Sequence, residues 1–272
     1  MITLKSEREI EKIRRSGKIT ATTLSMLIQT AKAGMTTSEL DALAEKSIRE
    51  RGGIPTFVGY HGYPATICVS VNDEVVHGIP GERVLEDGDL LSIDIGTTLD
   101  GYVSDSAVTI PVGEVSDEAR TLMRVTQECL MLGIAQMQVG KHLSDIGHAV
   151  QSHAEAHGYG VVRELVGHGV GTQMHEEPQV PNYGDPGKGL VLKPGLVLAI
   201  EPMINAGTHK VRILKDGWTV VTADGTLSAH FEHTIAVTEE GPKILTLRDV
   251  YEHADAALYR PKGEPALEER YS

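Results

Sequence analysis

The sequence predicts a protein of the α+β class that is built from two similar halves. Helical spacing of apolar residues opens the chain and returns after residue 116, and strand-like segments follow each time. The halves also match in register, because laying residues 34–52 on residues 140–158 superimposes the glycine at each end and the apolar positions between them. We therefore expect an internal repeat of two helix-helix-strand halves, about 6–112 and 116–238.

Two helices are predicted in each half. Ser6 followed by Glu9 is a capping box at the start of the first helix, and Gly52 predicts the end of the second, within TTSELDALAEKSIRERGG. In the second half, the segments SDEARTLMRVTQECLMLGIAQM and LSDIGHAVQSHAEAHG carry the same apolar periodicity. Each half should therefore place a helix pair before its strands.

Strands follow each helix pair and carry acidic residues at equivalent positions. In the first half they are TICVSV, LLSIDIG and DGYVSDSAVTIPV, with LDG as the turn between the last two, and in the second half they continue to about Thr238. In the repeat register, VLEDGDLLSIDIG lies over VLKPGLVLAIEPM, and SDSAVTI lies over FEHTIAV. This alignment pairs Asp94 with Glu201 and Asp105 with Glu232, all four within predicted strands.

Composition excludes several classes of function. Hydrophobic residues make up 40% of the chain, but no run of about 20 apolar residues is present, so no membrane span is expected. The first residues are charged and lack an apolar core segment, so no secretory signal is expected. The two cysteines, Cys68 and Cys129, give no disulfide framework and suit the cytoplasm. A formal net charge of -13 argues against general affinity for nucleic acid, and solubility explains it.

The four carboxylates require positive charge if they share an interior. They would repel one another strongly, and LLSIDIG, SDSAVTI, LAIEPM and FEHTIAV contain neither lysine nor arginine. Two divalent cations would offset the charge of four carboxylates, and carboxylates can bridge paired metal ions about 3.5 to 4 Å apart. The sequence therefore predicts a centre with two divalent metal ions.

Histidines near these strands supply nitrogen ligands and proton donors. VGHGVGTQMHEEP contains His168 and His175, and VNDEVVHGIP places His77 at a position comparable to that of His175. The chain has no HExxH pair, paired CxxC, phosphate-loop lysine motif, GxSxG or GxGxxG, so the chemistries of those motifs are excluded. Water or hydroxide bridging two metals is a nucleophile at pH 7, which predicts hydrolysis of a carbonyl or phosphoryl compound. Oxygen ligands with imidazole suit Mn, Fe, Co or Zn.

With these residues identified, the chain resembles the methionine aminopeptidases, specifically the bacterial-type class I. The resemblance covers roughly residues 2–249 and is carried by GYHGYPATICVSVNDEVVHGIP, SIDIGTTLDGYVSD, VGHGVGTQMHEEPQVPNYG, LAIEPM and LSAHFEHTIAVT. It implies the pita-bread fold, in which two helix-helix-strand halves surround a curved antiparallel sheet. One catalytic domain over residues 1–250 is expected, followed by a polar tail at 251–272 that is either a surface segment or a partner contact.

The resemblance implies a role for each site residue. Asp94 would chelate one metal, Asp105 and Glu232 would bridge both, and His168 and Glu201 would complete the shell of the other. Glu201 would also be the general base, His77 would contact the substrate backbone, and His175 would stabilise the oxyanion. The methionine pocket would be lined by Tyr60, Tyr63, Cys68, Met174 and Trp218, with His77 and His175 beside it. Met174 departs from the many bacterial members with Phe there, and a monovalent cation, Na or K, is implied near Asn72, Glu74 and Ser228.

The function implied is removal of the initiator methionine from nascent chains whose second residue is small. An X-Pro dipeptidase or aminopeptidase P is the enzymatic alternative, although those relatives usually carry an additional N-terminal domain. The non-enzymatic alternative is a binding module that has lost its metal ligands. It is disfavoured because all five ligand positions carry residues that can bind a metal. Nascent polypeptide N-termini are the expected partners, with a transient ribosome contact implied by the family alone, and a monomer is expected.

Overall fold

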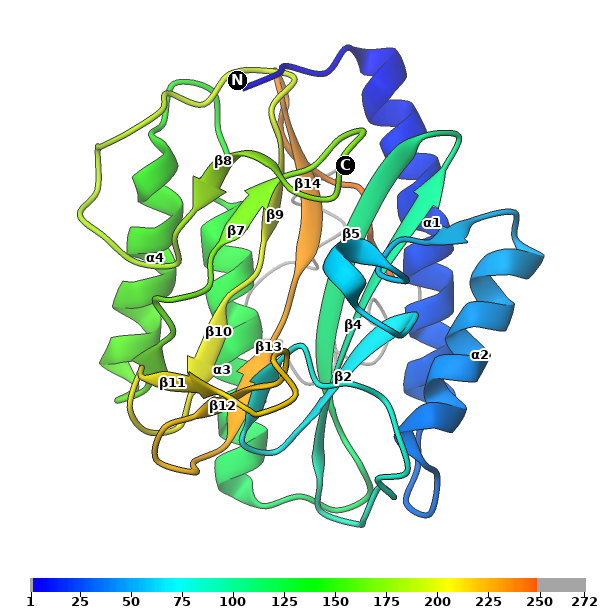
Figure 1. Cartoon of the computed structure of the whole chain (residues 1–272). Helices are drawn as coiled ribbons and strands as arrows, with labels where there is room; N and C mark the ends of the chain where they lie inside the picture. The colour runs from blue at the N-terminus through cyan, green and yellow to red at the C-terminus, as the bar shows by residue number, and fades with distance from the viewer. Residues whose placement is uncertain (1, 249–272) are drawn as a thin grey trace, which may run out of the picture.

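The structure is a computed structural model that describes residues 2–248 (Figure 1). The predicted tail at 251–272 lies outside the described residues. In the part of the chain that is described, no helix is long and apolar enough to cross a membrane. The described elements are mixed helix and strand, and they follow the predicted order of a helix pair and then strands, twice over.

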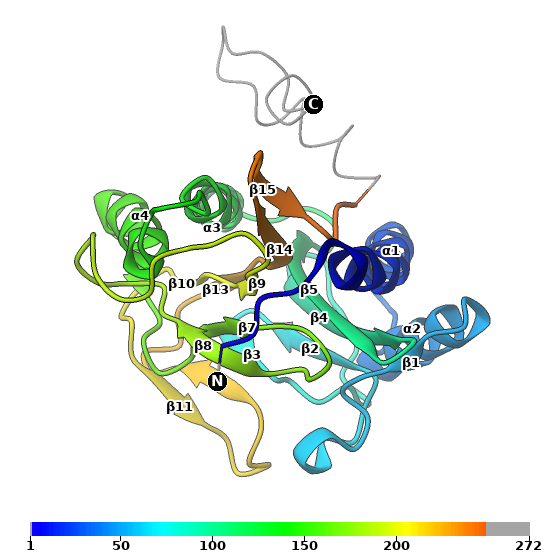
Figure 2. The ribbon, with the colours of Figure 1, turned by 90° about the horizontal axis from the view of Figure 1, so that it is seen from above.

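The four helices within residues 2–248 begin and end close to where the sequence predicts. The capping box of Ser6 and Glu9 is formed, and the second helix ends just before Gly52. Seen from above, one pair lies outside β4 and β5, and the other pair lies outside the strands of the second half (Figure 2). The bounds are α1 Glu7–Thr30, α2 Thr37–Glu50, α3 Asp117–Ile134 and α4 Leu143–Ala156.

The strands form four hydrogen-bonded groups, and every pairing among them is antiparallel. The first half contributes β1 Ile54–Pro55, β2 Ile67–Val71, β3 Glu74–Val76, β4 Leu90–Leu99 and β5 Tyr102–Pro111. The second contributes β6 Gly160–Val161, β7 Gly167–Gly169, β8 Glu176–Val180, β9 Val197–Ile200, β10 Met203–Asn205, β11 Val211–Ile213, β12 Val220–Thr222, β13 Ser228–His230, β14 His233–Thr238 and β15 Gly241–Ile244. The orders are β1-β4-β2 with β5 on β4, β15-β14-β9-β7-β8, β13-β10-β6 and β11-β12-β3.

The internal repeat is visible in backbone geometry. Gly34 and Gly140 have φ of 90° and 87°, and both lie in the left-handed region that glycine enters without a Cβ penalty. The bridge from Thr36 to Val84 in the first half has its counterpart in a bridge from His142 to Val191 in the second. The repeat therefore extends from side-chain pattern to individual turns.

One apolar core runs through both halves and fixes the strands against the helices. Leu40 and Ile48 of α2 and Ile93 and Ile95 of β4 are fully buried in a cluster that also includes residues of α3, α4 and β9. Alternate residues of a strand point to opposite faces, so packing Ile93 and Ile95 into this core directs Asp94 to the other face. The core therefore sets the direction of the first acidic side chain.

The halves join along β5 and the segment between β13 and β14. The Glu232 N–H donates to the Ala107 carbonyl at 2.9 Å, and the Ser106 hydroxyl donates to the Glu232 carbonyl at 2.8 Å. Thr234 Oγ1 accepts from the Asp105 N–H at 2.9 Å and donates to the Asp105 carbonyl at 2.8 Å. These contacts hold Asp105 and Glu232 in fixed relation, although they come from different halves.

Replacing the hydroxyl at the junction should destabilise the fold. Thr234→Val keeps the shape of the side chain but leaves both buried Asp105 backbone groups without this partner, which should lower the free energy of unfolding by about 1–3 kcal/mol. Urea denaturation followed by circular dichroism measures the change. Thr121→Val is the matched control, because the Thr121 hydroxyl makes only a solvent-exposed hydrogen bond within α3, to the Asp117 carbonyl. An equal loss in both variants would contradict this view of the junction.

Candidate active site

Two aspartates of the predicted centre lie on one face of the β4–β5 hairpin. The register pairs Asp94 with Ala107 and Gly96 with Asp105, so the two carboxylates are diagonal neighbours. The main-chain hydrogen bond from Glu232 to Ala107 places the third carboxylate beside them. The first half and the junction therefore supply three acidic side chains to one place.

The second half adds His168 and Glu201 from neighbouring strands. His168 lies in β7 and pairs with Ala199 of β9, and its Nε2 is 3.6 Å from Glu201 Oε1 and 3.7 Å from Asp105 Oδ2. The His168 Nδ1–H donates to the Gly169 carbonyl at 2.9 Å, which leaves the Nε2 lone pair directed to the acidic groups. The structure thus brings the five predicted metal ligands together.

The prediction that Glu201 and Glu232 lie inside strands is wrong in detail. β9 ends at Ile200, because Pro202 has no N–H to continue the ladder, and Glu201 occupies the break. Glu232 lies between β13 and β14, where its N–H bonds to the other half instead of to a strand neighbour. Both carboxylates therefore project from interruptions in strands, whereas Asp94 and Asp105 project from strand interiors.

The carboxylates lie together, and three of their buried oxygens have no hydrogen-bond partner within residues 2–248. Burial raises the pKa of Asp105 to about 7, and burial together with the neighbouring acidic groups raises the pKa of Asp94, Glu201 and Glu232. Among the described residues, Asp94 Oδ1, Asp105 Oδ1 and Glu232 Oε1 are buried with no hydrogen-bond partner. One ligand atom each from Asp105, His168 and Glu232 lies within 4.8 Å of the others, which fits a metal ion.

Two neighbours of the centre were not predicted from the sequence. Arg248 is 2% exposed, donates from Nη1 to Ser106 Oγ at 2.8 Å and lowers the pKa of Glu232 against the larger effect of burial. His230 is buried, with Nε2 3.9 Å from Glu201 Oε2. Neither position belongs to the aligned acidic pairs, and Arg248 lies beyond the four strand segments that carry the carboxylates.

A cavity of about 410 Å³ opens onto the centre and contains every predicted pocket residue. Its walls include the five metal-ligand candidates, and the seven predicted substrate-contact residues Tyr60, Tyr63, Cys68, His77, Met174, His175 and Trp218. Six more wall residues were missed, because nothing in their local spacing marks them: Phe57, His61, Val76, Leu165, Val166 and Met203. Acidic and imidazole groups therefore share one cavity with aromatic and thioether side chains.

His77 and His175, two of the histidines in the cavity wall, have pKa values below the usual value for histidine. Burial, and then the charge of His175, lowers the pKa of His77 to about 4, and burial lowers that of His175 to about 4 as well. Tyr60 Oη is 2.6 Å from His175 Nδ1, and the His168 and His175 rings are 4.2 Å apart. The Tyr63 ring is 5.0 Å from that of Trp218, and its hydroxyl donates to main-chain carbonyls, so it serves as a fixed wall.

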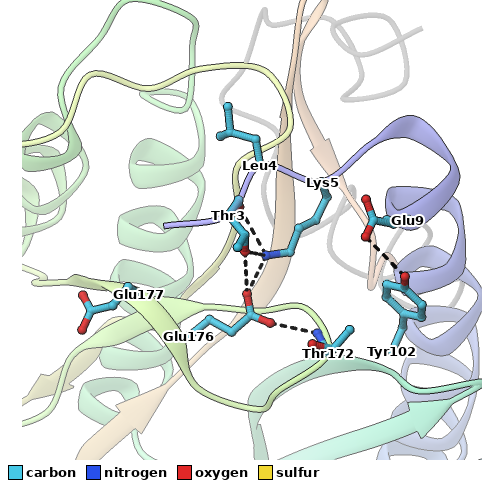
Figure 3. A pocket seen from close by; sticks show the side chains of 8 residues that line it. All are labelled: Thr3, Leu4, Lys5, Glu9, Tyr102, Thr172, Glu176 and Glu177. Atoms are coloured by element: carbon cyan, nitrogen blue, oxygen red, sulfur yellow. Dashed lines mark hydrogen bonds and ion pairs between the residues drawn. The ribbon is translucent and has the colours of Figure 1, made fainter. Parts of the chain in front are cut away.

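The N-terminal segment holds the loop that carries Met174 and His175. Figure 3 shows Glu176 between the chain start and this loop. One Glu176 oxygen accepts from the Thr172 and Gln173 N–H groups at 2.9 and 3.2 Å, and the other accepts from Lys5 Nζ at 2.5 Å and Thr3 Oγ1 at 3.1 Å. Burial alone would raise the pKa of Glu176, but these donors lower it. Glu176 is therefore an ionised anchor of the loop.

The proposed monovalent-cation residues are partly brought together. The Ser228 N–H donates to the Asn72 carbonyl at 2.9 Å, so these two are neighbours. The Glu74 carboxylate accepts instead from the Val71 N–H at 2.7 Å and from Arg83 at 2.9 Å. A cation at this place stays a prediction, and main-chain carbonyls would have to supply part of its shell.

Comparison with known proteins gives consistent results. The sequence profile of metallopeptidase family M24 matches residues 11–239. The methionine aminopeptidase 1 of Bacillus subtilis is 55% identical over 246 residues, which is 90% of this chain and 99% of the relative. The crystal structure of methionine aminopeptidase from Rickettsia prowazekii matches with a TM-score of 0.90 and 43% identity, over 91% of this chain and 100% of that one.

A more distant structure shares the fold alone. A prolidase from Pyrococcus furiosus matches with a TM-score of 0.75 at 24% identity, over 90% of this chain and 66% of that one. The pita-bread architecture that the family resemblance implied is thus confirmed by relatives both near and distant.

Loss of the Glu176 anchor should loosen the loop of Met174 and His175. Glu176→Gln removes the charged acceptor, so hydrogen exchange at the Thr172 and Gln173 amides should accelerate by about tenfold or more, since hydrogen bonds to charged groups contribute about 1.5–3 kcal/mol. Mass spectrometry of peptides covering the loop measures the rates. The exposed neighbour Glu177 supplies the control Glu177→Gln, and unchanged exchange in Glu176→Gln would refute the anchoring role.

Proposed function

The chain belongs to the methionine aminopeptidases of metallopeptidase family M24, and on this premise we propose that it removes the initiator methionine from nascent proteins and peptides whose second residue is small. One observation carries the proposal: five metal-ligating side chains meet in the same cavity as an apolar wall that suits a thioether. We place the reaction in the cytoplasm with nascent polypeptide N-termini as partners. A monomer and a transient ribosome contact remain predictions.

The residues that would hold two divalent ions are Asp94, Asp105, His168, Glu201 and Glu232. Their unpartnered buried oxygens and the free Nε2 of His168 fit such ions, and the mixture of oxygen and nitrogen donors suits Co, Mn, Fe or Zn. When bound, the ions supply an acidified water and polarise the scissile carbonyl. Bound ions would also reduce the charge repulsion among the four carboxylates, and this reduction would favour the folded protein.

Glu201 is the proposed general base. Its side chain is 15% exposed, so it is open to the cavity while most of its surface is shielded. Burial, with the charges of Asp105 and Asp94, raises the pKa of its carboxyl, which favours taking a proton from the attacking water at neutral pH. The proton received on Glu201 can then pass to the leaving amine.

His77 and His175 are proposed to orient the peptide and stabilise developing negative charge. If Tyr60 donates to Nδ1 of His175, the hydrogen of that neutral ring lies on Nε2, which is then a donor to the carbonyl oxygen. His77 lies after β3 with its ring 6.4 Å from that of Trp218, at the apolar side of the cavity. The two histidines therefore flank the position where the scissile bond would lie.

The methionine side chain would lie against Tyr63, Cys68, Met174 and Trp218. These side chains are apolar toward the cavity, and Met174 and Cys68 are 4% and 5% exposed. The flexible Met174 thioether can pack on a substrate thioether. X-Pro cleavage is the weaker alternative, because the likeness to the prolidase supports the fold alone.

Removal and return of metal should separate these functions. Protein stripped with chelator should be inactive, and Mn, Fe, Co or Zn should restore cleavage of Met-Ala-Ser but not of acetyl-Met peptide, whose amine is blocked. Product release measured by chromatography reports activity. Restored cleavage of Ala-Pro alone would assign an X-Pro peptidase, and a lack of turnover with every metal would assign a binding module.

Two substitutions should divide metal binding from substrate handling. Asp94→Asn should lose metal and activity together, because its orphaned oxygen is the proposed ligand. His77→Ala should keep full metal content yet lose about a hundredfold or more in kcat, the scale of one positioned donor or acid. Metal analysis beside steady-state kinetics measures both, and normal metal content with full activity in Asp94→Asn would disprove its role.

A further inference from the structure

A second group of metal-ligating side chains lies outside the active-site cavity, between α3 and α4. It consists of Glu128 from α3, His153 from α4 and His157, the residue that caps the C-terminus of α4, and one ligand atom from each lies within 4.8 Å of the others. His153 Nε2 is 2.7 Å from Glu128 Oε2, and the two imidazole rings are 4.6 Å apart. Figure 2 shows α3 and α4 side by side at the periphery.

The group is oriented as a ligand set. His157 Nδ1–H donates to the His153 carbonyl at 2.9 Å, which fixes the ring and leaves its Nε2 lone pair available. Arg124 holds Glu128 Oε1 at 2.7 Å, so the other oxygen is directed to His153. Glu128 and His157 are thus each held through one atom, while Oε2 of Glu128 and Nε2 of His157 stay available to a metal ion.

The internal repeat shows that the histidines replace an ordinary structural contact. In the register of residues 34–52 on 140–158, His153 and His157 lie over Ser47 and Arg51. Arg51 Nη1 donates to the Ser47 carbonyl at 3.0 Å, as His157 does to His153, and the Ser47 hydroxyl bonds to Thr23 of α1 at 2.8 Å. Both halves tie their two helices together here, but only the second half does so with metal-ligating side chains.

We propose that Glu128, His153 and His157 bind one late first-row divalent cation, of the Zn²⁺ class, which joins α3 to α4. Two imidazoles and one carboxylate favour Zn²⁺ or Cu²⁺ over Mg²⁺, which prefers oxygen ligands and keeps its waters. Glu128 and His153 side chains are 28% and 24% exposed, so an ion can enter and water can complete its shell. The ion would take the place of the proton between His153 and Glu128.

A bound ion would stabilise the α3–α4 pair, which packs against the strands that carry the second half of the active site. α3 packs against β9 and β10, on either side of the break that carries Glu201, and α4 packs against β8. The ion would bind outside the active-site cavity, so it would act on stability and take no part in the chemistry. Peptidase activity measured at saturating catalytic metal should not depend on it.

Equilibrium dialysis of the full-length chain against Zn²⁺, followed by metal analysis, tests the site. Wild type should retain one more Zn²⁺ per chain than the His153→Ala/His157→Ala double variant. Glu128→Gln should lower the affinity for that additional Zn²⁺ by more than about tenfold. His148→Ala, on the same helix but outside the group, should behave as wild type. Zn²⁺ should also raise the thermal midpoint of wild type more than that of the double variant.

Equal zinc content in wild type and the double variant would overturn the proposal, and so would displacement of the additional ion by an equal concentration of Mg²⁺. If the double variant does not fold by circular dichroism, His157→Ala alone is decisive, because this residue is exposed at the end of α4. Retention of the additional ion in folded His157→Ala and in Glu128→Gln would equally refute the site. The peptidase assay is separate, so the result does not depend on the proposed function.

Discussion

Four carboxylates that share one largely enclosed cavity repel one another, and the packing around them has to withstand that repulsion. Asp94, Asp105, Glu201 and Glu232 face one cavity, and burial and mutual charge raise their pKa values. Arg248 is close enough to lower the pKa of Glu232, yet three carboxylate oxygens still lack any partner among the described residues. Such an arrangement is costly without bound cations, so a fold that maintains it must be supported elsewhere by rigid packing.

The internal repeat provides that support and also explains the division of tasks. Each half contributes one carboxylate pair at equivalent positions of the repeat. Hydrogen bonds made by main-chain groups of Asp105, Ala107 and Glu232 join the halves directly beside the centre. The halves then diverge. Asp94 projects from a continuous strand, whereas Glu201 lies at a break before Pro202 and is open to the cavity, which suits a ligand that also moves a proton.

Much of this could be predicted from the sequence because the signals were local or repeated. The capping box at Ser6 and the end of α2 near Gly52 depend on short spacings, and the pairing of Asp94 with Glu201 depends on the internal repeat. The Lys5–Glu176 pair could not be predicted, because its members are 171 residues apart and neither belongs to a pattern. Arg248 and His230 were missed for the same reason, since only the tertiary fold brings them to the centre. The roles of individual ligands came from family resemblance and remain proposals.

A crystal structure of the full chain with Mn²⁺, using anomalous scattering to locate the metal, tests the central claim most directly. We expect two anomalous peaks about 3.5 to 4 Å apart among the acidic groups, both in contact with Asp105 and Glu232. If the protein is folded, the carboxylate oxygens keep the positions described above and no anomalous signal lies between them at saturating Mn²⁺, the proposed metal centre is contradicted.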